Sequence, residues 1–139
     1  VDCFTRECLA IEPRAKFQAL KVIEALDGVM AVRGKPKSIR VDNGPEFAGR
    51  LLDQWAYHNG VELDFSRPGK PTDNAYVESF NARLRSECLN ASWFLSLEDA
   101  AEKLRQWRTE FNTERPHSAL GNLTPQAFRA QTKKARKVA

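Results

Sequence analysis

The chain has 139 residues, of which 42% are hydrophobic and 29% charged, and its formal net charge is +4 at pH 7. This length fits one domain, and the composition is typical of a folded globular protein rather than a disordered one. No run approaches the roughly 20 apolar residues that cross a bilayer, which predicts that the protein has no membrane partner. Residues 129–139 carry five basic residues and no acid, which leaves −1 for the other 128 residues. Such a basic segment favours contact with a polyanion, and a solvated, frayed end is the ordinary alternative.

The first half of the chain alternates between strand and helix patterns. Apolar residues at alternate positions predict strands, and apolar residues three and four positions apart predict helices. Proline near the start and glycine near the end mark where the helices begin and stop. The predicted elements are a strand at 3–12, a helix at 13–34, a strand at 38–42, a helix from Pro45 to Asn59-Gly60 and a strand at 61–65.

The second half of the chain is predicted to be helical after a turn-rich loop at 66–71. One helix follows this loop to about Leu89, with Thr72 or Asp73 as its cap. Another spans 96–112, because Ser96 is a good cap and two acids occupy the first turn. A short helix starts at Pro125. We expect residues 1–114 to form a partial core and residues 115–139 to form a C-terminal loop, short helix and basic tail.

Asp42 stands at the end of a predicted strand, in "VDNGPEF". Strands that alternate with helices favour a parallel α/β sheet, and active sites in such sheets lie at the carboxyl ends of the strands. The ordinary alternative is a structural Asp-Asn-Gly turn, because aspartate often occupies turns and helix caps. Asp42 is therefore a candidate active-site residue.

Glu78 follows after 35 intervening residues, inside the helical pattern of "KPTDNAYVESF". We expect the apolar arc of this helix to pack on the sheet and to leave Glu78 at its edge, within reach of solvent. A glutamate on a helix is more often a plain solvated residue. The predicted arc consists of Tyr76, Val77, Phe80, Leu84 and Cys88.

Asp42 and Glu78 together suggest a divalent metal site. Mg²⁺ prefers hard oxygen ligands, keeps several waters and is often held by one or two carboxylates plus phosphate oxygens. Two ions would activate the attacking hydroxyl and stabilise the leaving oxygen of an in-line displacement. A pair of ions requires at least one further carboxylate.

Four segments in order carry a resemblance to a known family: "CFTRECLAIE", "VDNGPEF", "KPTDNAYVESFNARLR" and "WRTEFNTERPHSALGNLTPQAF". Together they closely resemble the integrase-core domain of bacterial insertion-sequence transposases, which belong to the Asp-Asp-Glu group related to retroviral integrases. The resemblance covers nearly the whole chain. It implies a ribonuclease H-like fold, with a mixed sheet flanked by helices, and metal-dependent cleavage and strand transfer of double-stranded DNA.

The resemblance also assigns residues. Asp42 matches the second catalytic aspartate of the family and Glu78 its catalytic glutamate, and the acids of the family bind Mg²⁺ or Mn²⁺. Lys70 and Asn74 match positions that face DNA or the site in relatives. From the residues themselves, Arg67 and Lys70 flank a helix start, where phosphate is attracted.

Three further residues have weaker indications. Arg85 and Arg83 are placed to extend the DNA-facing surface, although arginines on a helix are more often solvated charges. His117, in "ERPHSAL", invites a catalytic role. We interpret it instead as a residue that anchors its loop, because nothing in the sequence pairs it with a nucleophile.

The chain also departs from the family. The first catalytic aspartate of the family lies on its first strand, before the region matched by "CFTRECLAIE", and Asp2 matches a non-catalytic position. The resemblance thus implies a truncated core that lacks the first strand and most of the second and is inactive by itself. The strand at 3–12 would then have an unpaired edge that favours pairing with another chain.

Three functions stay open at this stage. The first is the C-terminal part of a transposase that acts in the bacterial cytoplasm at the nucleoid, as a homo-oligomer or paired with full-length transposase. The second is a non-catalytic remnant that binds DNA or pairs with transposase. The third is a nuclease for RNA–DNA hybrids, against which the "RPHSAL" and "TPQAF" segments argue by resemblance.

Overall fold

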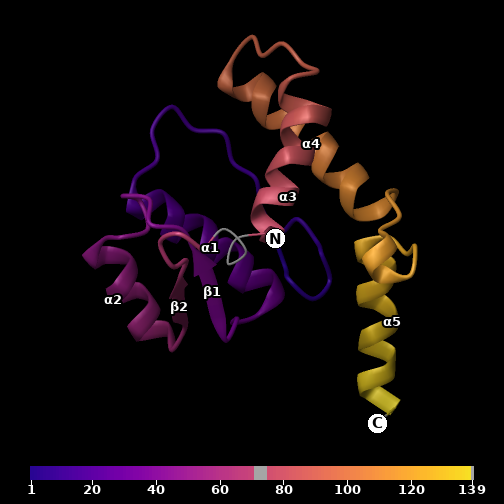
Figure 1. Ribbon diagram of the computed structural model, residues 1–139, viewed down its shortest axis with the longest axis horizontal. Helices are drawn as coiled ribbons and strands as arrows, with labels where there is room; N and C mark the ends of the chain where they lie inside the picture. The colour runs from indigo at the N-terminus through magenta and orange to yellow at the C-terminus, as the bar shows by residue number, and fades with distance from the viewer. Residues whose placement is uncertain (71–74, 139) are drawn as a thin grey trace. The chain divides into compact units, whose positions relative to one another are not determined.

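The computed structural model describes residues 1–70 and 75–138, without the side chains of 136–138 (Figure 1). The chain forms two compact units. Unit 1 comprises Val1–Pro13 and Ser79–Ala139, and unit 2 comprises Arg14–Glu78. The boundary expected between residues 114 and 115 stays a prediction. Within the described residues, no helix is both long enough and apolar enough to cross a bilayer.

Unit 2 alternates helices and strands as the sequence predicts. Its elements are α1 (Ala19–Arg33), β1 (Ser38–Val41), α2 (Arg50–Asn59) and β2 (Glu62–Phe65). The two strands pair in parallel (Figure 1), and Val41 lies opposite Phe65 at their carboxyl ends. The predicted parallel pairing of these two segments is confirmed.

The core of unit 2 is built mainly by α2. Leu52, Trp55 and Ala56 are buried on one side of this helix, and residues of α1, β1 and β2 pack against them. The indole Nε1 of Trp55 donates a hydrogen bond of 2.8 Å to Asp27 Oδ1 in α1. This bond satisfies the polar atom of an otherwise apolar side chain and fixes the two helices to each other.

Two helix starts differ from the prediction. The first helix begins at Ala19 rather than residue 13, and the second at Arg50 rather than Pro45. Around Pro45 the backbone makes a single turn instead, in which the N–H groups of Phe47 and Ala48 both donate to Gly44 O. The second helix does end where predicted, at Gly60, whose positive φ of 63° suits glycine.

Unit 1 is helical. α3 (Ala75–Leu84) enters this unit from Ser79 on and continues as one π-helical turn, Arg85–Leu89. α4 (Leu97–Thr113) follows, capped as predicted by Ser96, whose hydroxyl accepts a 3.0 Å hydrogen bond from Asp99 N. α5 (Pro125–Val138) starts at the predicted proline but is 14 residues long. The basic segment predicted as a tail is thus part of this helix.

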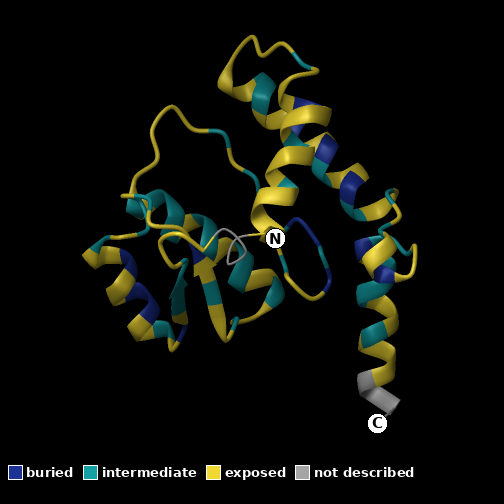
Figure 2. Ribbon diagram, viewed as in Figure 1, coloured by how far each residue is buried: buried dark blue, intermediate teal, exposed yellow. Residues whose placement is uncertain are grey.

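Part of the apolar arc predicted around Glu78 packs on α4. Phe80, Leu84 and Cys88 pack against Trp107 and Phe111 of α4, which are only 6% and 4% exposed. Buried positions recur along α4 (Figure 2). The sequence did not predict this partner, because α4 supplies an apolar stripe of its own. Packing of the arc on the sheet stays a prediction. Tyr76, by contrast, is 53% exposed.

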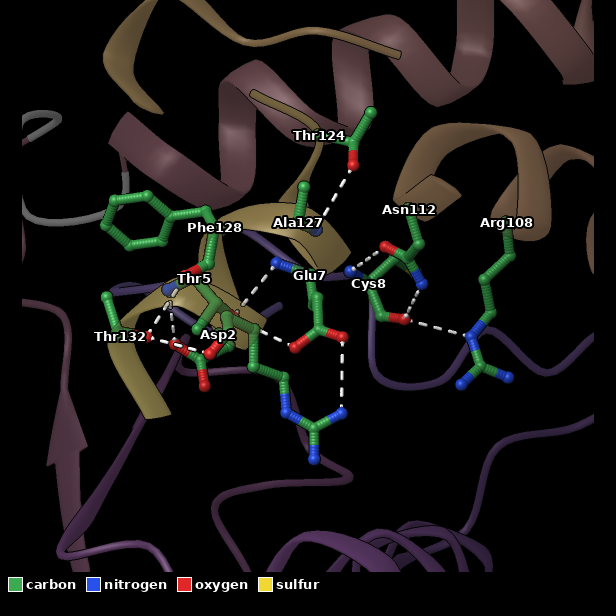
Figure 3. Close-up of polar contacts among 11 residues, drawn as sticks. Asp2, Thr5, Glu7, Cys8, Arg108, Asn112, Thr124, Ala127, Phe128 and Thr132 are labelled. Atoms are coloured by element: carbon green, nitrogen blue, oxygen red, sulfur yellow. Dashed lines mark hydrogen bonds and ion pairs between the residues drawn. The ribbon is translucent and has the colours of Figure 1, made fainter. Parts of the chain in front are cut away.

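The expected strand at 3–12 is absent, although all of its residues are described. Cys8 takes its backbone hydrogen bonds from side chains of α4 instead (Figure 3). Its N–H donates to Asn112 Oδ1 at 2.8 Å, and its carbonyl accepts from Asn112 Nδ2 at 3.0 Å and Arg108 Nε at 2.9 Å. The expectation of an unpaired strand edge is therefore wrong as well.

The same N-terminal segment contacts α5. The rings of Phe4 and Phe128 lie 5.4 Å apart. Glu7, whose side chain is 8% exposed, accepts a 3.2 Å hydrogen bond from the Thr5 hydroxyl and lies 3.7 Å from an Arg129 guanidinium nitrogen. Residues 1–8 thus connect α4 to α5 within unit 1.

We predict that Asn112→Ala destabilises unit 1 by about 1–3 kcal/mol, because the buried N–H of Cys8 loses its acceptor. The measurement is urea denaturation followed by circular dichroism. Thr113→Ala is the matched control, since Thr113 is exposed and its hydroxyl bonds only within the helix, to Thr109 O. Equal stability of the Asn112→Ala variant and the parent would contradict the role given to Asn112.

Candidate functional site

Asp42 follows β1 directly and is exposed. Its turn is tied to the segment after β2 by two hydrogen bonds. Ser66 N donates to Val41 O at 3.0 Å, and Asn43 Nδ2 donates to Ser66 O at 3.0 Å. The carboxyl ends of both strands thus meet at one edge, and Asp42 lies in the turn that follows β1. This is the edge at which open α/β sheets bind ligands.

Gly44 leaves room for two carboxylates in this turn. Its N–H donates a 2.9 Å hydrogen bond to Asp42 Oδ1. A Cβ at this position would lie 2.9 Å from Asp42 Oδ1 and 2.9 Å from Glu46 Oε1. Because real Cβ atoms do not approach so closely, any larger residue at this position would require both carboxylates to move.

Glu46 is a residue that the sequence did not single out. The available signal was an acid four positions after Asp42 across a Gly-Pro turn, a spacing that brings side chains together only if the chain makes one helical turn there. The expected α-helix from Pro45 would have given the same proximity. The structure reaches it through the isolated turn at Gly44 instead.

Two predicted DNA-binding residues lie on the loop that leaves the same edge. Arg67 and Lys70 are exposed, and their backbone is held in a turn by a 3.2 Å hydrogen bond from Lys70 N to Arg67 O. Gly69 supplies the positive φ of 70° that this turn requires. Since Ser66 is bonded to the Asp42 turn, the loop that carries these basic residues begins beside that turn.

Glu78 and Arg85 are each described within their own element. Glu78 is exposed in the first turn of α3. Arg85 is exposed in the π-helical turn and belongs to unit 1. Asn74 lies outside the described residues, as do Thr72 and Asp73. The convergence of Glu78 on Asp42 therefore stays a prediction.

The Asp42 turn suits a hard divalent cation. Asp42 and Glu46 offer carboxylate oxygens, and neither takes part in an ion pair with another described residue. In the described part of the chain, no group of three or more histidines, cysteines and acids is arranged to hold a metal. Mg²⁺ keeps several waters and is often bound by one or two carboxylates, so the donor set fits it.

His117 belongs to unit 1, where it holds its own loop. Its N–H donates to Leu123 O at 3.0 Å, its carbonyl accepts from Asn122 N at 2.9 Å, and its ring packs edge-on to Phe111 at 4.8 Å. Burial lowers the pKa of this imidazole, and the positive charges of Arg83, Arg115 and Arg6 lower it further. These contacts support the interpretation of His117 as a loop anchor.

Parallel strands with helices, and an acidic turn at the carboxyl edge, place the chain in the class of ribonuclease H-like integrase catalytic cores. Its fold is similar to that of the HTLV-2 integrase catalytic core domain solved in complex with magnesium in a trimeric form. The TM-score is 0.60 at 18% identity, over 81% of this chain and 70% of that chain. The predicted fold class is confirmed.

The chain belongs to the integrase core domain family, which matches residues 1–71 and again residues 59–125. A 31.7 kDa protein of insertion element IS407 from Burkholderia multivorans is 50% identical over 131 residues, which cover 94% of this chain and 47% of that protein. A 39.2 kDa protein of insertion element IS476 from Xanthomonas euvesicatoria is 43% identical over 94% of this chain and 38% of that protein. The chain thus spans less than half the length of these relatives, and the predicted family is confirmed.

We predict that Gly44→Ala lowers the affinity of the chain for Mn²⁺ about tenfold or more, because the added methyl group displaces the carboxylates of Asp42 and Glu46. Paramagnetic broadening of NMR signals from residues 42–46 measures this binding without any enzymatic assay. Gly49→Ala is the matched control, since a Cβ there meets nothing within 4 Å. Equal Mn²⁺ affinity in both variants would contradict a metal site at this turn.

We also predict that His117 titrates below the ordinary range of histidine and that Arg83→Gln raises its pKa by removing a nearby positive charge. Because the unfolded chain then binds more protons than the folded one, this histidine makes stability fall as the pH drops below its unfolded pKa. NMR titration of the imidazole Cε1–H measures the shift. Arg85→Gln removes the same charge from an exposed neighbour and should leave the pKa unchanged.

Proposed function

We propose that the chain is part of a DNA transposase of the Asp-Asp-Glu group, which cleaves DNA at the ends of an insertion element and joins these ends to target DNA. The observation that carries this proposal is the Asp42 turn. It lies at the carboxyl edge of two parallel strands, beside a loop with two basic residues. The family and the insertion-element relatives support the same function.

Asp42 and Glu78 hold Mg²⁺, or Mn²⁺, in this proposal, and Glu46 adds a carboxylate at the Asp42 turn. When bound, such a cation activates the attacking hydroxyl and offsets the charge that develops on the leaving oxygen. Gly44 keeps the space between Asp42 and Glu46 open. The hydrogen bond from Gly44 N fixes the direction of the Asp42 carboxylate.

The basic residues bind the DNA backbone. Arg67 and Lys70 neutralise phosphates next to the acidic turn, so that a polyanion can approach carboxylates that would otherwise repel it. Asn74 extends this contact, as its match to the family suggests, and Arg85 extends it from the helix, as its position there suggests. None of these side chains carries out a chemical step, and their role is to hold the scissile phosphate in place.

Full activity requires the longer protein and its assembly. The described residues bring two carboxylates together at the turn, whereas two ions need further acids. The relatives are more than twice as long as the region that this chain matches. We propose that the isolated chain is inactive or nearly so, that the complete cytoplasmic enzyme works as a homo-oligomer, and that this chain pairs with full-length transposase.

The test uses a hybrid in which this chain replaces the 131 matched residues of the IS407 protein. We expect Mg²⁺-dependent joining of DNA that carries the element ends, and we expect Asp42→Asn or Glu78→Gln to reduce the joining rate about 100-fold or more, because each removes a metal ligand. Gel analysis of labelled DNA measures the products. Asp53→Asn removes an exposed carboxylate from α2 instead and should retain full activity.

Two outcomes would overturn the proposal. One is a hybrid whose joining activity survives both Asp42→Asn and Glu78→Gln. The other is a hybrid that binds element-end DNA but never joins it while the intact IS407 protein does so under the same conditions, which would favour a purely DNA-binding role.

A further inference from the structure

α5 has two sides of different character. Pro125 is buried and Phe128 and Thr132 are half-buried, whereas Gln126, Ala130, Lys133 and Lys134 are exposed. The helix sequence "PQAFRAQTKKARKV" contains five basic residues and no acid. A helix with positive charge on one side and no acid among its residues is unusual for a plain solvated surface, where both signs are normally mixed.

The covered side of α5 already has its partners within unit 1. Phe128 packs on Phe4, and Arg129 pairs with the buried Glu7 at 3.7 Å. Glu7 therefore offsets one of the five positive charges and orients this side of the helix inward. Arg129 is a structural cation, with a side chain that is 28% exposed.

The exposed side keeps its charge. Lys133 and Lys134 take part in no ion pair with any described residue. Ala130 lies one turn before Lys134 and carries only a methyl group. It therefore adds no charge to this side of the helix. These two lysines are therefore available to neutralise the phosphates of a polyanion.

We propose that this exposed side of α5 is a second DNA-binding surface, which contacts the phosphates of duplex DNA without reading sequence. It takes DNA as the polyanion from the proposed function but uses a different part of the chain from the acidic turn. Lysines clustered along one helix are the electrostatic footprint of nucleic-acid binding. The helix fixes the backbone of both lysines, which reduces the entropy lost on binding compared with a disordered tail.

The test measures affinity for a labelled DNA duplex by fluorescence anisotropy. EDTA is present, so that no divalent ion occupies the proposed metal site. For the chain with Lys133→Gln and Lys134→Gln, the plot of log affinity against log salt should be shallower by about 1.8. Between about 50 and 200 mM NaCl the variant should then lose roughly tenfold less affinity than the parent. Ala130→Glu, which keeps both lysines, should weaken binding in the same assay.

The control removes the same charge elsewhere. Lys35→Gln with Lys37→Gln neutralises two exposed lysines of unit 2 and should leave the salt slope unchanged. Equal slopes in the α5 variant and the parent would overturn the proposal. A control whose slope becomes shallower by as much as that of the α5 variant would also overturn it. Tighter binding to RNA of the same length, with the same lysine dependence, would overturn the assignment to DNA. This assay contains no metal and measures binding alone. A failure of the DNA-joining experiment would therefore not change these outcomes.

Discussion

The parallel pairing of β1 with β2 is the constraint on which the candidate site depends. Four paired positions fix the register, and Val41 opposite Phe65 places the residues that follow, Asp42 and Ser66, side by side. A shift of one residue would turn the alternating side chains to the other face and separate the turn from the loop. The hydrogen bonds of Asn43 and Ser66 close this edge and hold the register at its functional end.

In unit 1 an extended segment is held by hydrogen bonds from side chains, whereas in unit 2 the extended segments are held by strand pairing. Asn112 matches the donor and acceptor of Cys8 with an amide of its own, so an extended segment is held on a helix without a neighbouring strand. Such a bond pattern satisfies the buried backbone at one residue only. The remaining hold on the segment comes from Phe4 and Glu7 against α5, and the position of α5 is thereby coupled to residues far away in the sequence.

Local patterns predicted those parts of the fold that local physics decides. The Ser96 cap, the end of α2 at Gly60 and the position of Asp42 after β1 all follow from residue types at fixed spacing. The segment at 3–12 was mispredicted because alternating apolar residues also suit an extended chain that is bound by side chains. The α4 partner of the α3 arc was not predicted because periodicity shows that a face is buried but not what covers it. The sequence did not predict Glu46 for a related reason, since its approach to Asp42 depends on the close turn at Gly44.

The proposed function requires carboxylates that hold a cation and a surface that still attracts a polyanion. This chain separates the two requirements along its sequence. The acids of the turn have basic residues a few positions beyond the neighbouring strand, and the largest excess of positive charge is placed on a single helix of the other unit. Because attraction between exposed charges is screened beyond roughly 10 Å, cations must lie close to the phosphates that they bind. Charge on an ordered helix is therefore more effective than the same charge spread over the surface, and the pairing of Glu7 with Arg129 orients that helix.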